Sequence, residues 1–149
     1  MKKKNFVQIV SALFVILFVY TGISKLIGYK EFIYELKESP ILKPYTGWLI
    51  WIVPGAELFI AFFLIVARWR KPALYASFFM MLLFTTYLFQ VNNLKYHIPC
   101  GCGGILEKLP IGVHIILNII LAILAVIAIW IERALIRTND HEFADVKYS

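Results

Sequence analysis

The residues best suited to chemistry are the two cysteines of the chain, Cys100 and Cys102, which flank a single glycine. A disulfide between residues two apart closes almost no chain, so it adds little stability to a fold. The two Cα atoms must also come closer than the roughly 7 Å of an extended segment, and Gly101 allows that bend at low cost. Strained, exposed disulfides exchange readily with other thiols. The pair therefore predicts redox chemistry rather than architecture.

Basic residues precede this pair, and they support two different interpretations. Lys95 and a protonated His97 would favour the thiolate form of a nearby cysteine, which is the reactive form. Alternatively, Cys100, Cys102 and His97 supply two soft ligands and one imidazole, a set that suits Cu(I) but falls short of a closed zinc site. His97 is also compatible with a solvated loop position, so the sequence leaves its role open.

The composition indicates a membrane protein. Hydrophobic residues make up 61% of the chain and its mean hydropathy is +0.78, above the usual range of soluble domains. Four apolar stretches each approach the about 20 residues that a helix needs to cross a bilayer. We predict an all-α membrane protein, a four-transmembrane-helix bundle with helices at about 6–27, 48–67, 73–91 and 111–131. Residues 1–137 then form the transmembrane domain and residues 138–149 a polar cytoplasmic tail. The first stretch is longer than a secretory-signal core and lacks a small-residue cleavage site, so we expect it to stay uncleaved.

Basic residues predict the orientation of this bundle. Those nearest the predicted membrane ends are Lys2, Lys3, Lys4, Arg68, Arg70, Lys71, Arg133 and Arg137. Because cytoplasmic flanks carry an excess of Lys and Arg, an N-in/C-in orientation follows. The Cys-Gly-Cys loop then faces the extracytoplasmic side, where disulfides persist. This bias accounts for the net charge of +6, and nothing in the sequence indicates a nucleic-acid partner.

The first outer loop, about residues 28–47, carries its own pattern. Phe32, Ile33 and Leu36 recur between charged residues at helical spacing. This spacing predicts a short amphipathic helix lying at the membrane interface.

Polar residues within the apolar stretches gather in the outer half of the predicted bundle. Lys25 lies near the outer end of the first helix, and Glu57 lies roughly 13 Å below the outer surface in the second. His114 and Asn118 lie one turn apart on the same face of the fourth helix, and Thr85 lies in the outer half of the third. Since such residues are costly in a membrane, they are candidates for function. Together they predict a polar pocket beneath the Cys-Gly-Cys loop.

Each of these residues also has a structural interpretation. Glu57 could pair with Lys25, although their predicted depths differ and the sequence leaves this contact open. His114 and Asn118 suit ordinary hydrogen bonds between helices. Thr85 suits a hydrogen bond to its own helix backbone.

Three short motifs carry a resemblance to a known family: Gly22-Ile23-Ser24-Lys25-Leu26, Pro54-Gly55-Ala56-Glu57 and Pro99-Cys100-Gly101-Cys102-Gly103-Gly104. On these motifs the chain resembles the MauE-type membrane proteins, within the wider DoxX-like group. The resemblance implies a bacterial plasma-membrane protein linked to thiol–disulfide chemistry and to maturation of the disulfide-rich subunit of methylamine dehydrogenase. It assigns Cys100 and Cys102 to the family's cysteine pair, and Lys25 and Glu57 to its buried charged positions.

These observations favour a membrane thiol–disulfide oxidoreductase or electron relay that uses Cys100 and Cys102. The chain has no further cysteine, so turnover needs another redox partner. One is a quinone near Thr85, Glu57 and His114, by analogy with other four-helix membrane disulfide oxidases. The other is an extracytoplasmic thioredoxin-like or disulfide-containing protein. Two alternatives stay open: a Cu(I)-handling membrane protein, and a non-enzymatic assembly factor or small-solute carrier built around Lys25, Glu57 and His114.

Overall fold

The computed structural model describes residues 2–39, 41–93 and 110–148, and these ranges contain helices and no strand. Four of the helices are long and apolar enough to cross a membrane. The predicted all-α architecture with four spanning helices is therefore confirmed, while its orientation stays a prediction. In chain order the elements are α1 (Lys2–Ile27), α2 (Tyr29–Glu38), η1 (Lys43–Tyr45), α3 (Thr46–Ile65), η2 (Ala67–Trp69), α4 (Arg70–Asn93) and α5 (Ile111–Tyr148).

The helix bounds follow the predicted ones closely, except at the end of α5. The sequence places the fourth span at about 111–131, whereas α5 continues without a break to Tyr148. Neither proline nor glycine occurs after Gly112, so nothing in the sequence terminates the helix there. The predicted tail at 138–149 therefore begins within a helix.

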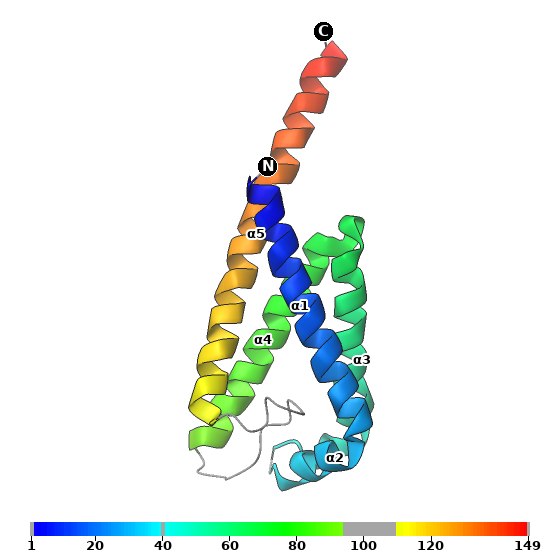
Figure 1. The fold of residues 1–149 in the computed structure, drawn as a ribbon, viewed down its shortest axis with the longest axis vertical. Coiled ribbons are helices and arrows are strands. Elements are labelled where there is room, and N and C mark those ends of the chain that lie inside the picture. The colour runs from blue at the N-terminus through cyan, green and yellow to red at the C-terminus, as the bar shows by residue number, and fades with distance from the viewer. Residues whose placement is uncertain (1, 40, 94–109, 149) are drawn as a thin grey trace.

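The four long helices form two antiparallel pairs (Figure 1). The most extensive contacts join α1 to α3 and α4 to α5. One end of the bundle contains α2, the end of α4 and the start of α5, and we call it the α2 end. At the opposite end α3 leads into α4 through η2, and we call it the η2 end. Figure 1 shows the two pairs separating toward the α2 end.

The apolar core lies in the half of the bundle near the η2 end. The buried residues that form it come from all four long helices: Val7, Val10, Phe14, Phe18, Ile60, Ala61, Leu64, Ala73, Leu74, Met81, Leu121, Ala122, Ala125, Ala128 and Ile129. Several are alanines on α5, and small residues let helix backbones approach closely within a membrane. This half of the molecule is therefore a packed scaffold.

A glycine allows the close approach of α1 and α3 near the middle of the bundle. A Cβ atom at Gly22 would lie 3.1 Å from Leu58 Cγ and 3.4 Å from the Pro54 carbonyl oxygen. The contact with Leu58 is tighter than most packing contacts, so a larger residue would require the Leu58 side chain or the two helices to shift.

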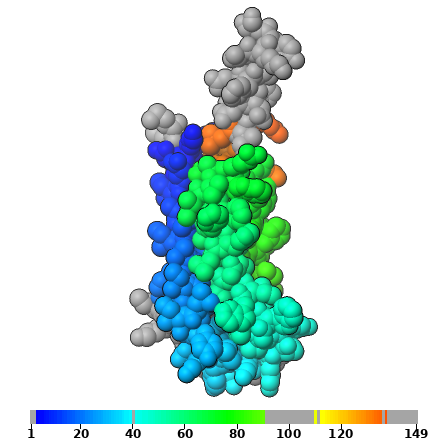
Figure 2. Space-filling view, turned by 90° about the vertical axis from the view of Figure 1, so that its right-hand side faces the viewer, coloured from blue at the N-terminus to red at the C-terminus, as the bar shows by residue number. Residues whose placement is uncertain are grey.

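The predicted amphipathic helix of the first connection is present as α2. It buries Phe32, Glu35 and Leu36 and exposes Tyr34. In Figure 2 the residues of α2 and η1, coloured light blue to cyan, gather at the base of the molecule beside α1 and α3. A location at the membrane interface stays a prediction.

Large apolar side chains cover the outside of the bundle. Trp48, Trp51 and Trp130 are 75%, 70% and 78% exposed. Exposure of this extent suits a surface that meets lipid, and Trp is enriched at the membrane boundary.

Candidate functional site

The predicted reactive residues, Cys100, Cys102 and His97, lie outside the described residues, as does Lys95. The segment that contains them, 94–109, connects α4 to α5 at the α2 end of the bundle. The supporting residues of the predicted site are described, and their geometry follows.

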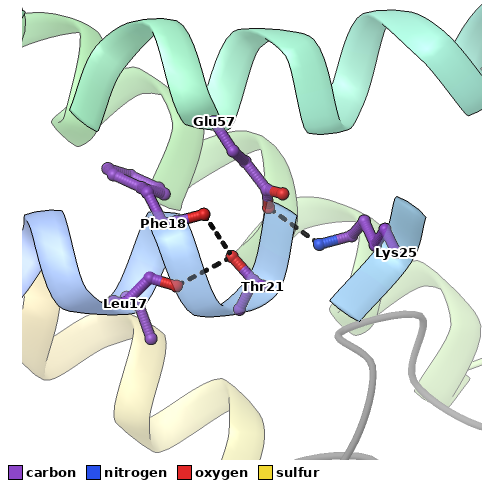
Figure 3. A network of polar contacts seen from close by, with 5 residues as sticks. All are labelled: Leu17, Phe18, Thr21, Lys25 and Glu57. Atoms are coloured by element: carbon purple, nitrogen blue, oxygen red, sulfur yellow. Dashed lines mark hydrogen bonds and ion pairs between the residues drawn. The ribbon is translucent and has the colours of Figure 1, made fainter. Parts of the chain in front are cut away.

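Lys25 and Glu57 form a buried ion pair. Lys25 Nζ donates a hydrogen bond of 2.8 Å to Glu57 Oε1, and their side chains are 3% and 0% exposed. Figure 3 shows the two side chains pointing toward one another from α1 and α3. The sequence left this pairing open because the two residues differ in depth along the bundle. The close approach of α1 and α3 and the length of the lysine side chain bring the charges together.

Thr21 completes the α1 side of this pair. Its hydroxyl donates to the Leu17 carbonyl at 3.0 Å and lies 3.5 Å from the Phe18 carbonyl. Figure 3 shows the same hydroxyl beside the Glu57 carboxylate. Thr21 was not among the residues predicted from the sequence, although its position four residues before Lys25 places both on one face of α1.

Two aromatic rings flank the Lys25 ammonium group. Nζ lies 5.9 Å from the ring centroid of Phe32 on α2 and 5.6 Å from that of Phe84 on α4. Both separations fall within the range of a cation–π interaction. Lys25 therefore contacts groups from α2, α3 and α4, and its charge is stabilised by rings as well as by Glu57.

His114 and Asn118 lie close to this ion pair. They are 2% and 6% exposed, and they line a cavity of about 20 Å³ together with Thr21, Lys25 and Glu57. We call these five residues the polar junction. The cavity has room for about one water molecule.

Three buried polar atoms of the polar junction have no hydrogen-bond partner within the described part of the chain: Glu57 Oε2, His114 Nδ1 and Asn118 Nδ2. Buried polar groups usually find partners. A small polar molecule in the cavity would satisfy them, because a water molecule both donates and accepts hydrogen bonds. The polar junction therefore has the room and the hydrogen-bonding groups to hold one water molecule between α1, α3 and α5.

Thr85 does not join the polar junction. Its hydroxyl donates to the Met81 carbonyl oxygen at 2.7 Å, which is the structural alternative considered for it. It is absent from the residues that line the cavity. The described residues thus bring together Glu57 and His114 but not Thr85.

A second and larger cavity, which we call the chamber, lies between α3 and α4 at the α2 end. Its volume is about 600 Å³, and its walls are mostly apolar. The lining residues on α1, α2 and α3 are Lys25, Phe32, Glu35, Leu36, Leu49 and Val53. The α4 wall runs from Phe79 to Gln90. The chamber was not predicted from the sequence, because ordinary apolar residues from four helices form most of its wall.

Lys25 and Phe84 line both cavities. They therefore form the partition between the polar junction and the chamber. A molecule in the chamber would lie against the same ammonium group that Glu57 binds from the other side.

The described residues contain no group of three or more His, Cys, Asp and Glu side chains arranged to hold a metal ion. The ligands predicted for Cu(I), Cys100, Cys102 and His97, lie outside those residues. The Cu(I) interpretation thus stays a prediction.

Comparison with known proteins finds one family and no individual relative. No curated protein and no solved structure matches the chain. The family described as methylamine utilisation protein MauE matches residues 3–131, which include the first three membrane-spanning stretches, most of the fourth, and the described residues that line both cavities. This match covers most of the 149 residues and agrees with a multi-pass membrane protein. The chain therefore belongs to the MauE family of methylamine utilisation proteins.

Proposed function

We propose that the chain is a membrane thiol–disulfide redox protein that acts on extracytoplasmic proteins through Cys100 and Cys102. The observation that carries this proposal is the position of the only two cysteines, one residue apart in the connection between α4 and α5. Cys100 follows the end of α4 at Asn93 by seven residues. An extended chain spans at most about 3.6 Å per residue, so the connection keeps Cys100 within about 25 Å of Asn93.

The proposed reaction forms a disulfide in a partner protein. A partner thiolate attacks the Cys100–Cys102 disulfide, which gives a mixed disulfide and frees one cysteine of the chain as a thiolate. A second partner thiolate then attacks the mixed disulfide. The partner leaves with a new disulfide, and the chain keeps two thiols and the two electrons. Lys95 and His97 favour the thiolate leaving group in this exchange.

The setting of this reaction follows from the predicted orientation. With the termini in the cytoplasm, the Cys-Gly-Cys connection faces the oxidising side of a bacterial plasma membrane. The partner is then a thioredoxin-like protein or a disulfide-containing protein undergoing maturation. A protein of the methylamine dehydrogenase type fits the family's role in methylamine utilisation. We include in this proposal that the chain belongs to the wider DoxX-like group of membrane proteins.

Trapping of the partner tests this function. Cys100→Ser and Cys102→Ser each leave one sulfur that can retain a partner, and the double variant leaves none. We expect one single variant to carry a covalent adduct with an extracytoplasmic protein, which a reducing agent releases and mass spectrometry identifies. The double variant should carry no adduct and should leave the partner's thiols reduced. An unchanged partner redox state in cells with the double variant would rule out the proposal.

The polar junction supports a second candidate, a non-enzymatic assembly factor or small-solute carrier. Its buried polar atoms that have no partner among the described residues offer hydrogen bonds to a small solute, and this binding would not require the cysteines. In that case methylamine-dependent growth would survive the double cysteine variant and fail in Glu57→Gln. Stoichiometric copper that is lost in the double cysteine variant would instead favour the Cu(I) interpretation.

A further inference from the structure

The chamber has the size and position of a binding site for a molecule that arrives through the lipid. Its volume of about 600 Å³ lies within the usual range of ligand pockets. Phe79 and Leu83 on its α4 wall are 60% and 67% exposed, on a helix long and apolar enough to span the membrane. A lipid-soluble molecule could therefore enter between α3 and α4 without passing through water.

The inner end of the chamber offers a hydrogen-bond donor between two aromatic rings. Lys25 Nζ carries three N–H groups, and one of them is donated to Glu57. The rings of Phe32 and Phe84 flank the same nitrogen, and both residues line the chamber. A flat ligand with an oxygen at its edge could stack on these rings and accept a hydrogen bond from Lys25.

The charges of the wall favour a neutral ligand. Among the described residues that line the chamber, the only Asp, Glu, Lys or Arg residues are Lys25 and Glu35, and Lys25 is already matched by Glu57. This described part of the wall thus provides no surplus positive charge for a carboxylate or phosphate head group. Burying an unmatched anion beside two carboxylates would be costly, whereas a carbonyl oxygen only needs a donor.

The electron balance of the proposed function requires a ligand of this kind. Oxidation of the Cys100 and Cys102 thiols to a disulfide releases two electrons and two protons. The chain has no other cysteine to take them. A quinone accepts both electrons and both protons as its two carbonyl groups become the hydroxyl groups of a quinol.

We propose that the chamber binds a lipid-soluble quinone, with one carbonyl oxygen on Lys25 Nζ and the ring between Phe32 and Phe84, and that this quinone reoxidises the cysteine pair. The groups proposed to hold the quinone all belong to described residues. The electron transfer rests on the proposed thiol–disulfide function.

Photolabelling of the full chain in lipid nanodiscs tests the binding. The probe is an azido-ubiquinone with a short isoprenoid chain, and labelled peptides are mapped by mass spectrometry. We expect labels on α4 between Phe79 and Gln90 and on α3 near Val53. Excess ubiquinone-1 or menaquinone-1 should remove the label, whereas equal excesses of oleate or phosphatidylglycerol should not. Removal by oleate or phosphatidylglycerol, or label spread evenly over the lipid-facing surface, would overturn the proposal.

Matched tryptophan variants on α3 sharpen the test. Val53→Trp and Leu49→Trp fill the chamber from two adjacent turns, while Ile52→Trp adds the same ring at a position that is 55% exposed and outside the chamber wall. We expect the chamber variants to weaken quinone binding about tenfold or more and the control to change it less than about twofold. Circular dichroism confirms folding of each variant. Equal effects in all three folded variants would overturn the proposal.

The cysteine variants separate failure of the site from failure of the function. Quinone binding should be retained in Cys100→Ser/Cys102→Ser, because the groups proposed to hold the ring and its carbonyl oxygen are Lys25, Phe32 and Phe84. Quinol formation from a reduced dithiol peptide should be lost in that variant and retained in Ile52→Trp. Binding without quinol formation in the unmodified chain would refute the redox function, whereas absence of binding would refute only the quinone site.

Discussion

At the scale of single residues, the Lys25–Glu57 ion pair is the most consequential contact of the described structure. Both charges are buried at 2.8 Å in a bundle that spans the membrane. Removal of one partner leaves the other charge buried and unmatched, which costs about 3–5 kcal/mol. Glu57→Gln and Lys25→Met should each lower the free energy of unfolding by that amount. Denaturation in mild detergent, followed by circular dichroism, measures the loss.

The control and the double variant decide whether the pair acts as a unit. Glu38→Gln changes an exposed carboxylate of α2 and should cost less than about 0.5 kcal/mol. Lys25→Met/Glu57→Met replaces both charges by apolar groups of similar size and should recover most of the stability, since such replacements of buried pairs are often neutral. If the losses of the two single variants simply add in the double variant, the pair does not form.

A second residue-scale prediction concerns the close approach of α1 and α3 at Gly22. Gly22→Leu forces a side chain against Leu58 and should destabilise the bundle by about 1–3 kcal/mol. Gly55→Leu is the matched control on α3, because no atom lies within 4 Å of a Cβ placed there. The free energy of unfolding should therefore be lower for Gly22→Leu than for Gly55→Leu. Equal values would mean that Gly22 plays no part in helix packing.

The sequence identifies most of the polar junction but not its geometry. Lys25, Glu57, His114 and Asn118 are conspicuous because polar groups are rare in apolar stretches. Thr21 was missed because threonine is common in such stretches and usually bonds to its own helix. The pairing of Lys25 with Glu57 could not be derived from depth alone, since it depends on how closely α1 and α3 pack.

At the scale of elements, α2 closes the α2 end of the chamber with one face only. Phe32 is buried, while Tyr34 on the same helix is 61% exposed. Phe32→Ala should therefore lower the free energy of local opening of α2, measured by hydrogen exchange of its amides. The decrease should be at most about 3–5 kcal/mol, which is the cost of truncating a buried phenylalanine. Tyr34→Ala should leave protection nearly unchanged. Equal protection in both variants would show that α2 is held by other contacts.

The elements themselves were largely predictable, because hydropathy and the spacing of apolar residues determine where a membrane helix runs. The end of α5 was not, since the change from apolar to polar residues near Ile131 marks the predicted end of a membrane span but does not stop a helix. The chamber was also unpredictable from sequence. It results from the divergence of α3 from α4, and no local pattern encodes the distance between two helices.

At the scale of the whole molecule, an even number of spans places both termini on one side and the Cys-Gly-Cys connection on the other. In reduced intact cells, a membrane-impermeant maleimide should label Cys100 and Cys102. A cysteine placed at Thr138 in the Cys100→Ser/Cys102→Ser background should be labelled only after permeabilisation. The reverse pattern would contradict the predicted N-in/C-in orientation.

The unequal halves of the bundle have a consequence for engineering and for evolution. Because the apolar core near the η2 end joins all four helices, exposed side chains of the chamber wall such as Phe79 and Leu83 can be exchanged with less risk to folding than the buried Lys25, Glu57 and Phe32. A chimera that keeps the residues of this core and takes its chamber wall from another family member should fold and acquire the donor's ligand preference. One scaffold could in this way serve membranes whose lipid-soluble electron carriers differ.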